Sequence, residues 1–215
     1  MVDTNSKRLQ EQILYYKARA DEYDDWYLRL GRYDYGKKWN NLWFKEVGQL
    51  NNALKKFNPQ GRVLEIACGT GWWTQELLKY ADSITALDPS PEVLEINQKK
   101  LNSLIVRYVQ ADIFAWKPKV QYDVVFFSFW ISHVPPKLFK KFWNIVHSAL
   151  TPDGRVFFID NFQSEKDLMA GKQFKGLRSI VSLRKVKDER EFNVIKIFYD
   201  TKKLKYKLQK LGWKF

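Results

Sequence analysis

The sequence predicts a single α/β domain built around a mostly parallel β-sheet. In the middle of the chain, five short apolar runs alternate with amphipathic helical stretches, which is the order that βαβ units produce. Two of these runs, Val124–Phe127 and Val156–Ile159, are apolar at every position, as strands covered on both faces require. The 215 residues are ample for one domain and few for two.

The first 60 residues are expected to form a helical flank, and residues 61–160 the core of the domain. Helical apolar spacing runs through residues 7–30 and 40–57, and a turn sequence at 58–61 then ends the second helix. The expected strands are Arg62–Ala67, Ser83–Asp88, Leu104–Val109, Tyr122–Phe129 and Arg155–Asp160. The expected helices of the core are 72–80, 90–102 and 136–149.

Residues 161–215 follow a different pattern and carry most of the net charge. Residues 161–178 have no clear period, which predicts a loop or lid. Ile180–Val186 and Phe192–Tyr199 predict an antiparallel hairpin, and a helix is expected over Thr201–Leu211, with the start of another strand at Gly212. This segment holds 15 basic and 6 acidic residues, so it accounts for +9 of the chain's formal charge of +13.

Composition narrows the class of protein. The single cysteine, Cys68, excludes an internal disulfide and a thiolate-rich zinc site, and we expect no metal. No apolar run approaches the ~20 residues that a membrane span needs, and the N-terminus lacks the apolar block of a secretory signal. A cytoplasmic location is therefore expected, and the sequence gives no indication of oligomeric state.

The turn after the first expected strand is the most informative segment. Gly69 and Gly71 let the backbone approach a ligand closely, and the helix that follows offers unpaired N–H groups at its start. A dinucleotide-binding fingerprint would need a third glycine where Thr74 stands, and no Gly-Lys-Ser/Thr triphosphate loop is present. The turn alone fits a phosphate, a carboxylate or a nucleoside.

Two carboxylates favour the nucleoside. Asp88 ends the second strand, where it can accept hydrogen bonds from both hydroxyls of a ribose. Asp112 follows the third strand, where it can accept a hydrogen bond from an adenine amine while Ile113 lies against the ring. The alternatives are that Asp112 caps a helix, and that Glu65 and Asp88 are surface carboxylates without a ligand.

Four strings together resemble the small class I methyltransferases that depend on S-adenosylmethionine (SAM). These strings are LEIACGTGWWT from Leu64, LDPSPEVLEIN from Leu87, VQADIF from Val109 and YDVVFFSFWISHVPP from Tyr122. The resemblance runs from about Tyr15 to Asn161. It implies a three-layer sandwich around a roughly seven-stranded, mostly parallel Rossmann-like sheet, with SAM across the carboxyl ends of the strands and S-adenosylhomocysteine (SAH) as product.

The resemblance also implies roles for individual residues. In that family the Glu65 position anchors the glycine loop, whose backbone near Ala67 and Gly69 holds the methionine part of SAM; the family often has glycine at the Ala67 position. Side chains of the opening segment would close over the methionine carboxylate. The full cofactor set is Tyr16, Arg19, Tyr23, Glu65, Ala67, Gly69, Gly71, Trp72, Asp88, Pro89, Asp112, Ile113 and Ser128.

This sequence departs from the family at its end. The family usually continues past the last helix into a final pair of strand segments, whereas this chain stops at Trp213-Lys214-Phe215. Either the sequence is truncated or the expected hairpin takes over that role.

Catalysis by this family needs few dedicated residues, because a sulfonium methyl group is already activated and alignment of the reactants supplies much of the rate. His133, just after the fourth strand, is the candidate general base, although a lone histidine is structural more often than catalytic. His147 is expected to be structural. The residues expected around the acceptor are Phe129, Trp130, Arg178, Arg184 and Lys185.

An apolar wall below a basic lid favours a small anionic or aromatic metabolite as the methyl acceptor. The charge also suggests an RNA or protein methyltransferase, and a SAM-binding module without catalysis is the other alternative. Ser128-Phe129-Trp130-Ile131 stands where many methyltransferases of base amines carry an Asn-Pro-Pro-Tyr-like tetrapeptide, which weighs against nucleic-acid bases.

Overall fold

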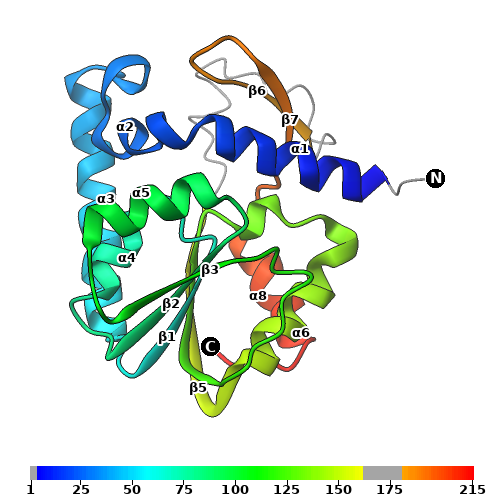
Figure 1. Ribbon diagram of the computed structural model, residues 1–215. Coiled ribbons are helices and arrows are strands. Elements are labelled where there is room, and N and C mark those ends of the chain that lie inside the picture. The colour runs from blue at the N-terminus through cyan, green and yellow to red at the C-terminus, as the bar shows by residue number, and fades with distance from the viewer. Residues whose placement is uncertain (1–3, 162–180) are drawn as a thin grey trace.

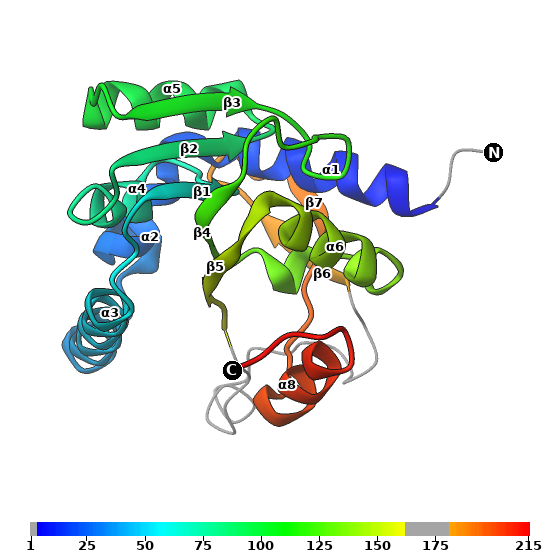
Figure 2. The same cartoon turned by 90° about the horizontal axis from the view of Figure 1, so that it is seen from below.

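The computed structural model describes residues 4–161 and 181–215, and a five-stranded parallel sheet lies at its centre. The strands are β1 (Arg62–Ile66), β2 (Ser83–Asp88), β3 (Val106–Gln110), β4 (Tyr122–Ser128) and β5 (Leu150–Ile159). They lie in the order β3-β2-β1-β4-β5, and every neighbouring pair is parallel (Figure 1, Figure 2). The direction of winding changes between β1 and β4, which is where ligands bind in such sheets.

Helices cover both faces of the sheet, as the apolar strands require. Side chains alternate along a strand, so Val124 and Phe126 face one layer while Val125 and Phe127 face the other. The first layer comprises α3 (Lys37–Phe57), α4 (Trp72–Leu77) and α5 (Pro91–Leu101). The second comprises α6 (Phe139–Ala149) and α8 (Thr201–Gln209). The predicted α/β class and parallel sheet are therefore confirmed.

The expectation of about seven strands in one sheet is wrong for the described residues. Strands β6 (Val181–Lys185) and β7 (Glu191–Ile195) pair antiparallel with each other and form a separate sheet. Helix α1 (Thr4–Ala18) covers this hairpin, because Val194 of β7 and Val186, which follows β6, pack against Tyr15. The hairpin is therefore held by α1 and does not extend the main sheet.

The chain after α8 also differs from expectation. No strand begins at Gly212; instead, the ring of Trp213 packs edge-on against Trp143 of α6, with ring centroids 5.0 Å apart. This contact fixes the last residues to the second helical layer.

The N-terminal flank lies across the carboxyl ends of the strands, beside the hairpin (Figure 1). After α1 it continues through short helices, namely η1 (Ala20–Glu22), α2 (Tyr23–Leu28) and η2 (Gly31–Tyr33). An ion pair of 2.6 Å joins Lys17 of α1 to Glu92 of α5, and Gln12 Nε2 donates to the carbonyl of His133, 3.4 Å away. The short helices η3 (Ile131–His133) and η4 (Pro136–Leu138) connect β4 to α6. Within the described ranges, no helix has the length and apolarity needed to cross a membrane.

Candidate functional site

The glycine loop leaves β1 through a left-handed backbone. Ala67, Gly69 and Gly71 have φ angles of 55°, 54° and 90°, a region that side chains with a Cβ rarely adopt. Ala67 therefore holds a strained conformation at the point where the strand ends. At Gly71 there is also no space, since a Cβ would lie 2.5 Å from Asn97 Oδ1. The loop geometry thus explains the requirement for glycine at position 71.

Buried polar side chains brace this loop from below. Thr74 Oγ1 donates to Glu65 Oε2 at 2.6 Å, which supports the anchoring role expected for Glu65. Asn97 Nδ2 donates to the Gly69 carbonyl at 3.2 Å and to Thr74 Oγ1 at 3.0 Å, and Tyr108 Oη donates to Asn97 Oδ1 at 2.9 Å. Burial raises the pKa of Glu65 to about 8. The sequence did not single out Asn97, because an asparagine in a helix is usually solvated.

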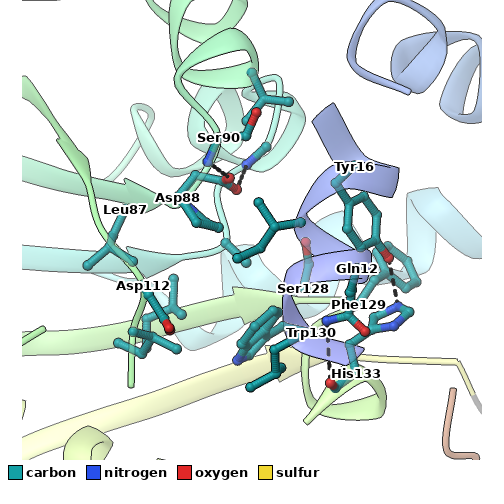
Figure 3. A pocket seen from close by; sticks show the side chains of 18 of the residues that line it. Gln12, Tyr16, Leu87, Asp88, Ser90, Asp112, Ser128, Phe129, Trp130 and His133 are labelled. Atoms are coloured by element: carbon teal, nitrogen blue, oxygen red, sulfur yellow. Dashed lines mark hydrogen bonds between the residues drawn. The ribbon is translucent and has the colours of Figure 1, made fainter. Parts of the chain in front are cut away.

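Asp88 is held at the end of β2 with its carboxylate directed at the loop. Its two oxygens accept the backbone N–H groups of Gly69 at 3.1 Å and of Ser90 at 3.0 Å (Figure 3). The side chain is buried, and this burial raises the pKa of Asp88 to about 6. An ionised Asp88 would gain from further hydrogen-bond donors such as ribose hydroxyls.

A first cavity lies over the carboxyl ends of β1, β2 and β4, and α1 covers it with Leu9, Gln12 and Ile13. Many of the predicted cofactor residues line it, namely Tyr16, Tyr23, Ala67, Gly69, Asp88, Pro89, Asp112, Ile113 and Ser128. Asp112 Oδ1 also accepts the Phe114 N–H at 2.9 Å, so this carboxylate caps a turn as well as lining the cavity.

Four predicted cofactor residues lie outside this lining. Glu65 lies beneath the loop and accepts from Thr74, and Gly71 ends the loop against Asn97. Trp72 stacks on Tyr27, with ring centroids 4.5 Å apart and planes 8° from parallel. Arg19 lies on the wall of a neighbouring cavity.

This second cavity, of about 460 Å³, lies between the N-terminal flank, the hairpin and the end of β4. Phe129, Arg184 and Lys185, all predicted near the acceptor, line it, whereas Trp130 lines the first cavity. Arg178 falls outside the described residues. The basic residues on its wall are Arg19, Arg32, Arg184, Lys185 and Lys196.

The described part of the lining of the second cavity contains five cations and no carboxylate, although Arg32 and Lys185 pair with Glu22 and Glu189, which lie outside the lining. Lys196 is buried; its Nζ donates to Ser132 Oγ at 2.8 Å and lies 3.5 Å from Asp160. Arg19 Nε donates to Tyr33 Oη at 3.2 Å, and the guanidinium has no ion pair with any described carboxylate. A partly desolvated cation without a counter-ion favours an anionic ligand. The sequence signal for Lys196 is a lone lysine within the apolar run Val194–Phe198.

The two cavities meet at four side chains, Tyr16, Tyr23, Phe129 and His133, which line both of them. Phe129 has a left-handed φ of 51°, so the chain is also strained at this junction. His133 is buried; its Nδ1 lies 2.5 Å from the Ile195 carbonyl and its Nε2 2.8 Å from Tyr16 Oη (Figure 3). A group transferred from one cavity to the other would pass these residues.

Comparisons with known proteins agree with this geometry. The family described as methyltransferase domain matches residues 63–154. A solved structure described as the DhpI-SAM-HEP complex is 34% identical, with a TM-score of 0.77, and the alignment covers 96% of this chain and 89% of that one. A DhpI-SAH complex is 32% identical, with a TM-score of 0.76 and coverage of 95% and 87%.

Two curated relatives match over a smaller share of their own length. Methyltransferase OMS1, mitochondrial, of Saccharomyces cerevisiae is 27% identical over 200 residues, which is 77% of this chain and 38% of that protein. Malonyl-acyl-carrier protein O-methyltransferase 1 of Ilyobacter polytropus is 29% identical over 112 residues, covering 51% and 40%. The matched region thus spans about two fifths of these relatives.

Together, the parallel sheet, the glycine loop and the matches to methyltransferases define the class. The chain belongs to the class I SAM-dependent methyltransferases. It is an enzyme of this class, and its cofactor is SAM.

Proposed function

We propose that this enzyme transfers the methyl group of SAM to a small anionic or aromatic acceptor bound in the second cavity. The observation that carries this proposal is the contact between the two cavities at Tyr16, Tyr23, Phe129 and His133. A cofactor in the first cavity would present its sulfonium methyl group toward an acceptor in the basic one. Alignment of the two then supplies much of the rate, as displacement at a sulfonium requires.

The cofactor is proposed to lie along the carboxyl ends of β1 and β2. Asp88 would accept the ribose hydroxyls, Asp112 and Ile113 would hold the adenine, and the backbone of Ala67 and Gly69 would hold the methionine part. Glu65, Thr74 and Asn97 support the loop from beneath. The largely apolar lining of the first cavity, whose described residues include no lysine for a phosphate, suits a nucleoside better than a nucleotide.

The acceptor is proposed to be small and anionic for two reasons. A cavity of about 460 Å³ suits a metabolite, and its walls carry five basic side chains. RNA would need a wider basic track with several phosphate contacts. The DhpI complex named for both SAM and HEP supports a site for a second component beside the cofactor, and curated relatives named O-methyltransferases favour an oxygen as the atom methylated.

A methyl-transfer assay tests this proposal. Radiolabelled SAM is incubated with a panel of small carboxylic, phosphorylated and aromatic metabolites and with total cellular RNA, each at two salt concentrations. We expect label in a small anionic acceptor. Label found only in RNA, and fading as the salt concentration rises, would contradict the proposal. Binding of SAM with no transfer to any acceptor would favour a non-catalytic module.

A variant of Arg184 adds a sharper test with the acceptor found. Arg184→Gln removes a charged donor from the cavity wall, so the KM for an anionic acceptor should rise about 10-fold or more, while the KM for SAM stays unchanged. Arg190→Gln is the matched control, because Arg190 lies on the same hairpin and pairs with Asp188 in its exposed turn. An equal effect of both substitutions would contradict the assignment.

Cofactor affinity should depend on pH through Asp88. Because burial raises its pKa to about 6, protonation below that pH removes the charged acceptor, and the affinity for SAH should fall up to ~10-fold per pH unit. The stability of the free protein changes in the opposite direction: between about pH 4 and 6 the native state binds this proton more tightly than the unfolded chain, so acidification stabilises the fold. Calorimetry from pH 5 to 8 measures the affinity; Asp88→Asn should abolish the dependence near pH 6.

Two further expectations stay predictions: that residues 1–215 act as one methyltransferase domain with the flank, core and basic segment described above, and that the protein is cytoplasmic. The mitochondrial name belongs to the yeast relative.

A further inference from the structure

The hydrogen bonds of His133 determine which nitrogen carries its proton. Nδ1 lies 2.5 Å from the Ile195 carbonyl, and a carbonyl can only accept, so Nδ1 carries the proton. Burial lowers the pKa of His133 well below its ordinary value, with a further effect from the charge of Lys196. The ring is therefore neutral, and its Nε2 lone pair accepts the hydroxyl proton of Tyr16 at 2.8 Å.

The groups that face His133 keep it neutral. Lys196 just after β7, Arg184 of β6 and Arg19 just before η1 are all cations, and all lower its pKa. Tyr16 of α1 is the titratable group hydrogen-bonded to the ring, and burial raises its pKa well above the ordinary value. Neither partner of the Tyr16–His133 hydrogen bond therefore changes its protonation near neutral pH.

This arrangement limits what Tyr16 can do at the junction of the cavities. A phenol has one hydroxyl proton, and Tyr16 already donates it in the hydrogen bond to His133 Nε2. Tyr16 Oη cannot then donate to the methionine carboxylate, which was one of the roles expected for the opening segment. It can offer only its lone pairs to a ligand.

We propose that His133 is a positioning residue that fixes Tyr16 Oη as an obligate acceptor facing the sulfonium methyl group, and that it takes no proton from the methyl acceptor. This inference rests on the proposed placement of SAM in the first cavity. The hydrogens of a methyl group on a cationic sulfur are electron-poor, so an oxygen lone pair stabilises them through C–H···O contacts. In this arrangement a lone pair of Tyr16 Oη faces the methyl group of SAM. SAH has no such methyl group.

Comparing the two ligands tests this role without any acceptor. By calorimetry, Tyr16→Phe should weaken SAM binding about three- to five-fold, in line with the strength of such contacts, and leave SAH binding nearly unchanged. His133→Ala should also weaken the binding of SAM more than that of SAH. His133→Gln can still accept a hydrogen bond from Tyr16, so it should bind SAM with nearly the wild-type affinity. Tyr206→Phe is the matched control, because Tyr206 is exposed on α8.

The outcomes separate this inference from the proposed function. Equal losses for SAM and SAH, or no loss for either, would overturn the role of Tyr16 while leaving the cofactor site intact. A wild-type protein that binds neither ligand would contradict the proposed function, and this inference with it.

Nuclear magnetic resonance tests the protonation directly on the wild-type protein. The chain has two histidines, so His147→Gln assigns the signals of His133. We expect the proton on Nδ1 throughout the range from about pH 5 to pH 8, with the Nε2 resonance displaced in Tyr16→Phe. A proton on Nε2, or titration of His133 between about pH 6 and pH 7, would overturn the proposal.

Discussion

Asp88→Ala is expected to weaken SAH binding by about 1.5–3 kcal/mol, or ~10- to 150-fold in Kd. The substitution removes a carboxylate that accepts the N–H groups of Gly69 and Ser90 and that is proposed to accept the ribose hydroxyls. Isothermal titration calorimetry near neutral pH measures the effect, since wild-type Asp88 is largely ionised there.

Asp88→Asn is the informative companion. The amide keeps one oxygen as an acceptor but loses the charge, so its affinity for SAH should lie between those of the wild-type protein and Asp88→Ala. An Asp88→Ala protein that binds SAH within about threefold of the wild-type affinity would show that this carboxylate does not hold the cofactor.

Gly71→Ala should lower the free energy of unfolding by about 2–4 kcal/mol, through a steric clash and backbone strain combined. The new Cβ would lie 2.5 Å from Asn97 Oδ1, and the residue would keep a φ of 90°. Because Asn97 holds the Gly69 carbonyl and Thr74, the displaced side chain should weaken SAH binding as well. Urea denaturation without ligand and calorimetry with SAH measure the two effects.

The chain supplies a matched control at Gly48. This glycine lies within α3, and a Cβ there would meet nothing within 4 Å, so Gly48→Ala should stabilise the protein by up to about 1 kcal/mol. Gly71→Ala should also cost less in an Asn97→Ala background, where the clash is absent and the strain remains. If the effects of Gly71→Ala and Asn97→Ala on the free energy of unfolding are additive, the clash with Asn97 is not the cause of the loss.

The fold was predictable where the apolar pattern is strict. Val124–Phe127 of β4 and Val156–Ile159 of β5 are apolar on both faces, and the turn from β1 to α4 has glycines at two of its positive φ angles. The bounds of the hairpin were predicted to within a few residues, but its position against helix α1 was not predicted. Its position depends on the packing of Val186 and Val194 against Tyr15, and no local pattern encodes a contact between segments so far apart in the sequence.

Asp88 ends β2 and Asp112 follows β3, and both line the first cavity, where the sequence placed a ligand; their contacts with the cofactor stay predictions. The site was less predictable where function depends on side chains from distant segments. The role expected for Arg19 at the methionine carboxylate stays a prediction; the side chain lies on the wall of the second cavity beside Tyr33. Lys196 was not singled out, because its burial depends on Ser132 and Asp160 of other segments. His133 was a candidate from the sequence, but only its hydrogen bonds to Tyr16 and Ile195 determine which ring nitrogen carries the proton.

The most direct test of the cofactor site is a calorimetric titration of the wild-type protein with SAH, ATP and NADH in parallel. A first cavity that binds a nucleoside through Asp88, Asp112 and the glycine loop should bind one SAH per chain, with a Kd on the order of micromolar, and the two phosphate-bearing ligands much more weakly. Tighter binding of ATP or NADH than of SAH would contradict the assignment of the first cavity as a SAM site.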